Sequence, residues 1–126
     1  MSLIHIPSQK KNPKKALVSY LPESYSLPPD HPNFFGHSNF QECRTLLNCL
    51  SEAGYCCDVI GWMDDVEPYF DKNYDLFIGT SFASLMHGRK LVHKKGKVIA
   101  YTTTAHWLFH NTSEYNRLSL FRERRK

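Results

Sequence analysis

The sequence lacks the features that mark membrane-spanning proteins, secreted proteins and proteins of unusual composition. No apolar run approaches the ~18 residues that a membrane-spanning helix requires. The N-terminus is not a secretory signal, because its basic tract follows a few apolar residues instead of preceding an apolar core. Hydrophobic residues make up 41% and charged residues 22% of the 126 residues, as in ordinary globular domains. We therefore expect a basic flexible leader over residues 1–15 and a single cytoplasmic domain over residues 16–126.

Cysteine is present, but not in a pattern that makes a site. None of the four cysteines forms a C-x-x-C pair; they are Cys43, Cys49, Cys56 and Cys57. The adjacent Cys56 and Cys57 would point to opposite faces of a strand. We interpret all four as small buried side chains in a reducing compartment, with no redox or zinc role.

Positive charge is concentrated near both ends of the chain, and the formal net charge is +4. Lysines occupy most of residues 10–15, and three arginines and a lysine lie within residues 122–126. Such clusters suit nucleic acid or an anionic membrane surface. No aromatic-rich strand of the RNA-binding type accompanies either cluster. We interpret both as solvated ends, expect no nucleic acid partner, and leave peripheral membrane contact open for the C-terminal cluster.

The first half of the expected domain contains the clearest secondary-structure signals. Residues 16–21 form a short apolar run suited to a buried strand. Four prolines and a glycine then predict a long irregular loop over residues 22–36. A capping-box pair and apolar residues at helical spacing predict a helix over residues 38–53, which Gly54 ends in a left-handed conformation.

The second half predicts further strands and helices in alternation. Strands are expected at 56–61, 74–79 and 97–101, a short helical turn at 66–70, and a helix at 81–95 that Gly96 ends. Asn111, with Glu114 three residues later, predicts the start of a final helix.

This alternation predicts a parallel sheet with helices on both faces. We expect an α/β fold of the Rossmann-like type, with three α-β-α layers and four strands or slightly more. Counting the expected strands along the chain, the spatial order is expected to be 3-2-1-4. Ligands in such sheets bind beyond the carboxyl ends of the strands, here between strands one and four.

Two segments fall at that position. Gly36 directly precedes a helix, and a helix start favours phosphate, although a glycine that merely turns the loop explains the residue equally well. Residues 102–111 combine hydroxyls, imidazoles and aromatics, a mixture suited to sugar recognition. His106 and His110 have the spacing of two metal ligands on one helical turn, but no third ligand accompanies them, so we expect no metal.

Five stretches resemble one family in their order and spacing. They are residues 36–39, 50–60, 74–79, 98–106 and 111–125. Together they resemble the N-terminal domain of retaining glycosyltransferases of the family 4 (group 1) type. The resemblance covers about residues 15 to 125.

The resemblance implies a GT-B glycosyltransferase, in which two Rossmann-like domains enclose a cleft. It implies hexosyl transfer from a nucleotide sugar to a glycan, lipid or small-molecule acceptor, with the N-terminal domain mainly binding acceptor. The C-terminal donor-binding domain and its E-x7-E motif are missing from these residues, so we expect the chain alone to turn over negligibly. Two alternatives stay open: a subunit of a split glycosyltransferase, and a non-catalytic binding or regulatory domain.

The resemblance also implies roles for individual residues. Gly36 and His37 would face the donor diphosphate from the helix start, and His106 would occupy the position of the family's active-site histidine. No cofactor or metal is implied. Our own inference adds three acceptor-lining residues: Phe35, Thr103 and Trp107.

Overall fold

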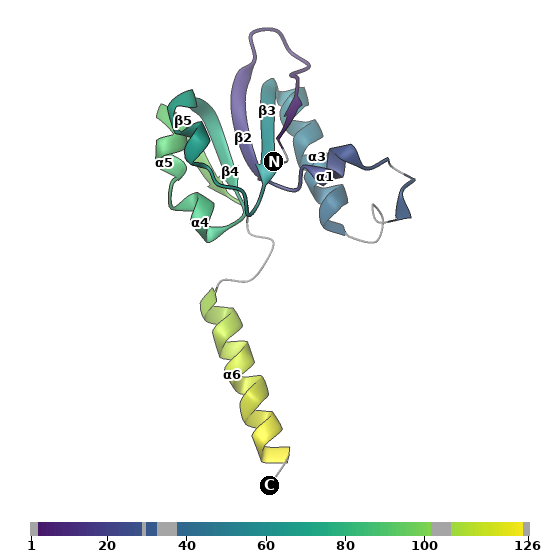
Figure 1. Cartoon of the computed structure of the whole chain (residues 1–126), viewed down its shortest axis with the longest axis vertical. Coiled ribbons are helices and arrows are strands. Elements are labelled where there is room, and N and C mark those ends of the chain that lie inside the picture. The colour runs from purple at the N-terminus through teal and green to yellow at the C-terminus, as the bar shows by residue number, and fades with distance from the viewer. Residues whose placement is uncertain (1–2, 29, 33–37, 102–106, 125–126) are drawn as a thin grey trace.

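A five-stranded, mostly parallel sheet forms the centre of the protein (Figure 1). The computed structural model describes residues 3–28, 30–32, 38–101 and 107–124, the side chains of residues 38 and 107–111 excepted. The strands are β1 (Ile4–Ile6), β2 (Lys14–Tyr20), β3 (Tyr55–Gly61), β4 (Tyr74–Gly79) and β5 (Val92–Ala100). Strands β2 to β5 pair in parallel, and β1 pairs with β3 in the antiparallel sense. The prediction of an α/β fold is confirmed.

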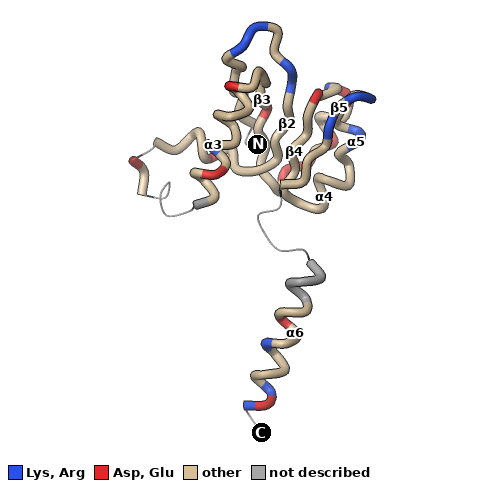
Figure 2. The backbone as a smooth tube through the Cα atoms, turned by 180° about the vertical axis from the view of Figure 1, so that it is seen from behind, with Lys and Arg blue, Asp and Glu red and all other residues tan. Residues whose placement is uncertain are grey.

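Helices cover both faces of the sheet. The described helices are α1 (Glu23–Ser26), α3 (Ser38–Ala53), the 3-10 helix η1 (Glu67–Lys72), α4 (Phe82–Leu85), α5 (Gly88–Leu91) and, away from the sheet, α6 (Trp107–Arg124). On one face α3 packs, and on the other η1 and α5. In Figure 1, α6 stands apart from the sheet. The backbone trace in Figure 2 shows many of the body's Lys and Arg residues at the end of the sheet away from α6.

Two apolar clusters hold these layers together. Cys43 and Leu47 of α3 pack in one cluster with Val18 of β2. Leu17, the neighbour of Val18, points to the other face and packs in the cluster that contains Leu91 of α5. Because successive strand residues alternate between faces, a strand covered on both sides needs an unbroken apolar run, as residues 16–18 provide.

Two elements have the bounds that the sequence predicts. The helix expected over residues 38–53 is α3, and the strand expected over 74–79 is β4. Gly54 ends α3 with a φ of 103°, in the left-handed region that glycine tolerates.

The predicted strand order is wrong. In the numbering of the prediction, the observed parallel order is 2-1-3-4 and not 3-2-1-4. The outer edge of β3, where the prediction would place β4, is occupied by β1. Strand β4 instead pairs with the free edge of β2, so the direction of strand addition reverses between β2 and β4.

The helix predicted over residues 81–95 is also wrong. Two four-residue helices, α4 and α5, replace its first part, and Val92 already begins β5. Gly96 therefore lies inside a strand and does not end a helix. The apolar spacing that favoured a helix includes Phe82 and Met86, whose side chains are exposed instead of packed on a helix face.

Smaller differences appear at both ends and in the long loop. Within the expected flexible leader, residues 4–6 form β1. The loop expected over 22–36 contains α1. The final helix begins at Trp107, so Asn111 lies inside α6 and not at its start.

The cysteines differ in their environments. Cys43 and Cys57 are buried, as predicted, and burial raises the pKa of the Cys57 thiol to about 12. Cys56 is half-buried and Cys49 is exposed, so the prediction that all four are buried is wrong. All four are free thiols.

Candidate functional site

The turn after β3 presents a tryptophan at the carboxyl edge of the sheet. The Gly61 N–H donates a 2.8 Å hydrogen bond to the Asp64 carboxylate, and the Asp64 N–H donates a 3.0 Å bond to the Gly61 carbonyl. A Cβ on Gly61 would lie only 3.1 Å from that carboxylate, so a glycine suits this position. The turn leaves Trp62 50% and Met63 78% exposed.

Neighbouring strand ends supply polar groups in fixed positions. The Trp62 N–H donates to the Tyr20 carbonyl at 2.9 Å, which continues the β2–β3 ladder beyond the last strand residue. At the end of β4, the Thr80 hydroxyl donates to the Ser19 carbonyl at 2.9 Å. The Ser81 hydroxyl accepts the Ser84 N–H at 3.2 Å and caps α4. These contacts hold Thr80 and Ser81 beside Trp62.

A hollow of about 420 Å³ opens between these strand ends, within the range of small-molecule sites. We call it the cleft; its lining residues are Tyr20, Leu21, Asn39, Trp62, Thr80, Ser81 and Phe82. Two further hollows, of about 380 and 270 Å³, also have Trp62 in their walls. The cleft therefore combines aromatic rings with hydroxyl and amide groups.

The Tyr20 side chain is the most unusual member of this lining. It is only 4% exposed, and its hydroxyl has no hydrogen-bond partner among the residues that the structure describes. Burial raises the pKa of Tyr20 to about 12, with a smaller contribution from the Glu42 carboxylate. The Tyr101 ring lies 5.6 Å from the Tyr20 ring, tilted by 53°. Tyr20 therefore contributes an aromatic ring to the lining and carries a buried hydroxyl whose hydrogen-bonding capacity is unused among the described residues.

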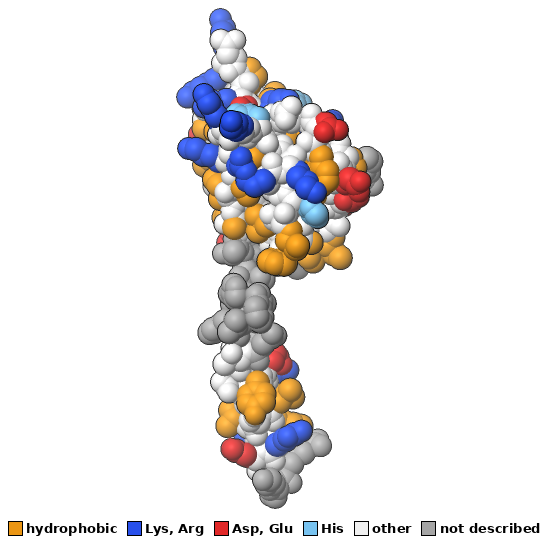
Figure 3. All heavy atoms as spheres, turned by 90° about the vertical axis from the view of Figure 1, so that its left-hand side faces the viewer, with side chains coloured by type: hydrophobic (Ala, Val, Ile, Leu, Met, Phe, Trp, Pro, Cys, Tyr) orange, Lys and Arg blue, Asp and Glu red, His pale blue; other side chains and the backbone are white. Residues whose placement is uncertain are grey.

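Exposed apolar side chains border the cleft. We call this set the apolar rim; it consists of Trp62, Met63, Phe82 and Met86, which are 50 to 78% exposed. Figure 3 shows hydrophobic side chains gathered at the end of the body nearest α6. Apolar side chains grouped on one edge are typical of a surface that meets another molecule or domain.

The residues that the sequence predicts for the site are not placed by the structure. Phe35, Gly36, His37, Thr103 and His106 lie outside the described residues. Trp107 begins α6, but its side chain is outside the described part.

Residues that flank the two predicted site segments, 35–37 and 103–107, lie in the described part of the chain. Asn39, near the start of α3, lines the cleft, and Tyr101, which follows β5, contacts the Tyr20 ring. The N–H of Tyr101 also donates to the Gly79 carbonyl at 2.9 Å. Both predicted segments therefore adjoin residues at the carboxyl edge of the sheet.

Sequence reasoning missed Tyr20, Trp62 and Phe82. The signal available for the first two was their place at the end of an apolar strand, where parallel sheets bind ligands. Phe82 was instead assigned to the apolar face of a long helix.

A comparison of the chain with protein-family models, curated proteins and solved structures found no match. Within the described part of the chain, no group of three or more His, Cys, Asp or Glu side chains is arranged to hold a metal ion. None of the described helices is both long and apolar enough to cross a bilayer.

Proposed function

We propose that this chain is the acceptor-side domain of a nucleotide-sugar-dependent glycosyltransferase with the GT-B arrangement of two Rossmann-like domains. It would act in the cytoplasm and pass a hexosyl group to a glycan, lipid or small-molecule acceptor. The observation that carries the proposal is the cleft at the carboxyl edge, whose lining combines the aromatic residues Tyr20, Trp62 and Phe82 with polar side chains.

The lining suits a sugar for a chemical reason. Sugar rings have apolar faces, which stack on aromatic rings such as Trp62, and hydroxyl groups at their edges. Asn39 and Thr80 have the amide and hydroxyl groups that bind such edges.

The negative charge of the carboxylates around the cleft indicates that other groups hold the donor diphosphate. Glu23 and Asp64 line a hollow that adjoins the cleft, and Asp65 lies beyond Trp62. Carboxylates repel a diphosphate, whose departure requires preorganised positive groups. We assign that role to Gly36 and His37, which precede α3 in the sequence, together with a donor-binding half.

The apolar rim supports the need for such a second half. Trp62, Met63, Phe82 and Met86 lie where a domain that closes the cleft would pack. The same surface serves a covalently joined domain and a separately encoded subunit, so the split transferase stays a candidate. In both cases His106 would act near the transferred sugar.

A binding experiment with the purified chain tests the acceptor role. Saturation-transfer NMR with a panel of mono- and oligosaccharides should detect at least one binder, and Trp62→Ala should abolish its signal. Tyr115→Ala removes an exposed aromatic of α6 and serves as the matched control. Failure of the whole panel to bind, or equal loss in both variants, would contradict the proposal.

A second experiment separates the transferase from a non-catalytic domain. His106→Ala should remove transfer activity from the complex reconstituted with its donor-binding half, and leave the affinity between the halves unchanged. Full transfer activity in the variant would show that His106 has no part in the reaction.

A further inference from the structure

Lysines gather at the amino ends of the parallel strands, on the opposite edge from the cleft (Figures 2 and 3). We call the exposed set the lysine edge; it consists of Lys10, Lys11, Lys14, Lys94 and Lys95. Lys14 lies level with Tyr74 of β4, which pairs with Val92 at the start of β5. Residues 93–96 of β5, which we call the β5 turn, interrupt the regular pairing with β4 and include Lys94 and Lys95. The strand register therefore places Lys14 about 10 Å, or two strand spacings, from the β5 turn.

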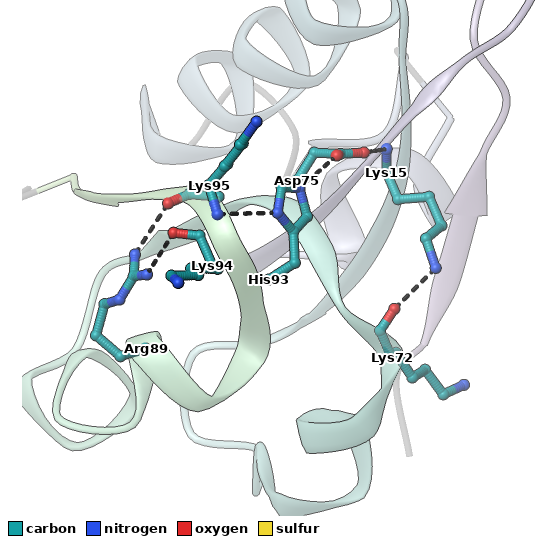
Figure 4. A network of polar contacts seen from close by, with 8 residues as sticks. Lys15, Lys72, Asp75, Arg89, His93, Lys94 and Lys95 are labelled. Carbon is teal, nitrogen blue, oxygen red and sulfur yellow. Dashed lines mark hydrogen bonds and ion pairs between the residues drawn. The ribbon is translucent and has the colours of Figure 1, made fainter.

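The backbone that carries these lysines is fixed by one carboxylate. Asp75 of β4 accepts the Lys15 N–H at 2.8 Å on one side and a His93 ring N–H at 2.8 Å on the other (Figure 4). The other ring nitrogen of His93 accepts the Lys95 N–H at 3.1 Å. Asp75 thereby ties the two lysine-bearing segments to the same strand.

Arg89 fixes the β5 turn from its outer side. Its guanidinium donates to the carbonyls of Gly96 at 2.9 Å and Lys94 at 3.3 Å (Figure 4). The arginine is thus occupied by backbone carbonyls, and the charge offered outward comes from lysines.

The ammonium groups of the lysine edge form no close pair within the described part of the chain. None of the five ammonium groups makes a hydrogen bond or an ion pair there, although the charge of Lys14 contributes to lowering the pKa of Asp75. The nearby Asp75 carboxylate is already engaged by Lys15 and His93. The edge therefore presents five positive charges to solvent from two anchored segments.

We propose that the lysine edge binds the surface of an anionic lipid bilayer. Clusters of four to eight basic residues attract anionic lipids, and each lysine near the surface adds to the affinity. Lysine behaves as a hydrated point charge, which suits a diffuse layer of headgroups more than paired recognition of single phosphates. The two segments, exposed at one end of the molecule, can meet a plane together.

Nucleic acid fits the same surface less well. Binding to single strands uses aromatic side chains on which bases stack. Among the described residues, the large exposed aromatics lie on the apolar rim and on α6, not at the lysine edge. This inference does not depend on the proposed function, because it uses the edge opposite the cleft.

Vesicle co-sedimentation of the full chain tests the inference. Vesicles of phosphatidylcholine containing one third phosphatidylserine should bind the chain, and pure phosphatidylcholine vesicles should not. Raising the salt from ~0.1 M to ~0.5 M should release it, because exposed charges are screened. Replacing four lysines with glutamine should weaken binding roughly 100- to 1,000-fold; they are Lys10, Lys11, Lys94 and Lys95.

The matched control removes the same number of charges elsewhere, by glutamine replacement of Arg117, Arg122, Arg124 and Lys126. This variant should retain most of the binding, and circular dichroism should show that both variants fold. Equal loss in both variants would overturn the inference, since net charge alone would then explain binding. Salt-sensitive binding of a short DNA duplex without binding to the anionic vesicles would overturn it as well.

Discussion

The Tyr74 hydroxyl donates a 2.6 Å hydrogen bond to the Asp58 carboxylate across an intervening strand. Asp58 is on β3 and Tyr74 is on β4, and β2 runs between them. The other Asp58 oxygen lies 2.8 Å from a ring nitrogen of His5 on β1. Three side chains thus connect β1, β3 and β4, in addition to the backbone hydrogen bonds between neighbouring strands.

This connection predicts loss of stability in acid. Burial by itself would raise the pKa of Asp58, but the hydrogen bonds from His5 and Tyr74 outweigh it and hold that pKa below its ordinary value. A carboxyl with a lowered folded-state pKa stabilises the protein above the unfolded-state pKa, near 3.9. That contribution should disappear as the pH falls below about 4 and through the folded-state pKa.

The variant Asp58→Asn tests the acid dependence. It should lower the free energy of unfolding by about 1–3 kcal/mol at neutral pH, because it removes a charged acceptor from two hydrogen bonds. Urea denaturation should show a smaller difference between variant and parent as the pH is lowered below about 4. A difference that stays constant down to acid pH would show that the charge of Asp58 contributes nothing.

Tyr20→Phe should stabilise the unliganded chain. The variant removes a buried hydroxyl that has no partner among the described residues, and such a group costs about 1–3 kcal/mol. We expect the free energy of unfolding to rise by about 1 kcal/mol in urea titrations. A marked loss of stability would mean that the hydroxyl is hydrogen-bonded in the folded chain.

Gly96→Ala should destabilise the β5 turn. A Cβ at this position would lie 2.6 Å from the Val92 Cβ and 3.0 Å from the Tyr74 carbonyl, so the backbone must shift. Overpacking of this kind costs about 1–3 kcal/mol. Lys95→Ala, at the exposed neighbouring position, is the control, and thermal unfolding should separate the two. Equal melting temperatures for both variants would contradict the close approach.

The apolar rim predicts self-association of the isolated chain. Phe82→Ser combined with Met86→Ser should reduce the concentration-dependent increase in mass seen by light scattering. Because both side chains are exposed, the stability of each single variant should change by no more than about 0.5 kcal/mol. A parent chain that stays monomeric at high concentration would show that the rim is too weak to associate with itself.

Local chemistry was sufficient to predict α3 and β4. The helix is marked by apolar residues at its own period and by Gly54 at its end, and the strand is marked by the apolar run of residues 76–78. Each signal lies within the element, so no knowledge of distant contacts was needed.

Distant contacts decided the elements that were predicted wrongly. The chain from Ser81 to Lys95 has helical spacing, but Val92 pairs with Tyr74. The need for a glycine at position 88 also depends on a distant residue. A Cβ there would lie 2.8 Å from a methyl group of Val98, ten positions away. The lateral order of the strands depends on which edge of the sheet can still accept a partner. Residues Ile4–Ile6 of the expected leader pair with the outer edge of β3, so β4 could not pair there.

The site could be located in part from the sequence. The carboxyl edge of the sheet was expected to bind ligand, and the cleft is there, but Tyr20 and Trp62 were not singled out. The importance of the Tyr20 hydroxyl depends on the absence of a neighbouring acceptor, which only a three-dimensional arrangement can show.

Parallel strands give the whole molecule a direction, since all their amino ends lie at one edge and all their carboxyl ends at the other. A chain adsorbed on a bilayer through Lys94 and its neighbours would therefore hold Trp62 on its far side. The seven residues of β2 set the separation at roughly 23 Å. Reactants would then reach the cleft from bulk water, and an acceptor that stays embedded among lipid tails would be out of reach.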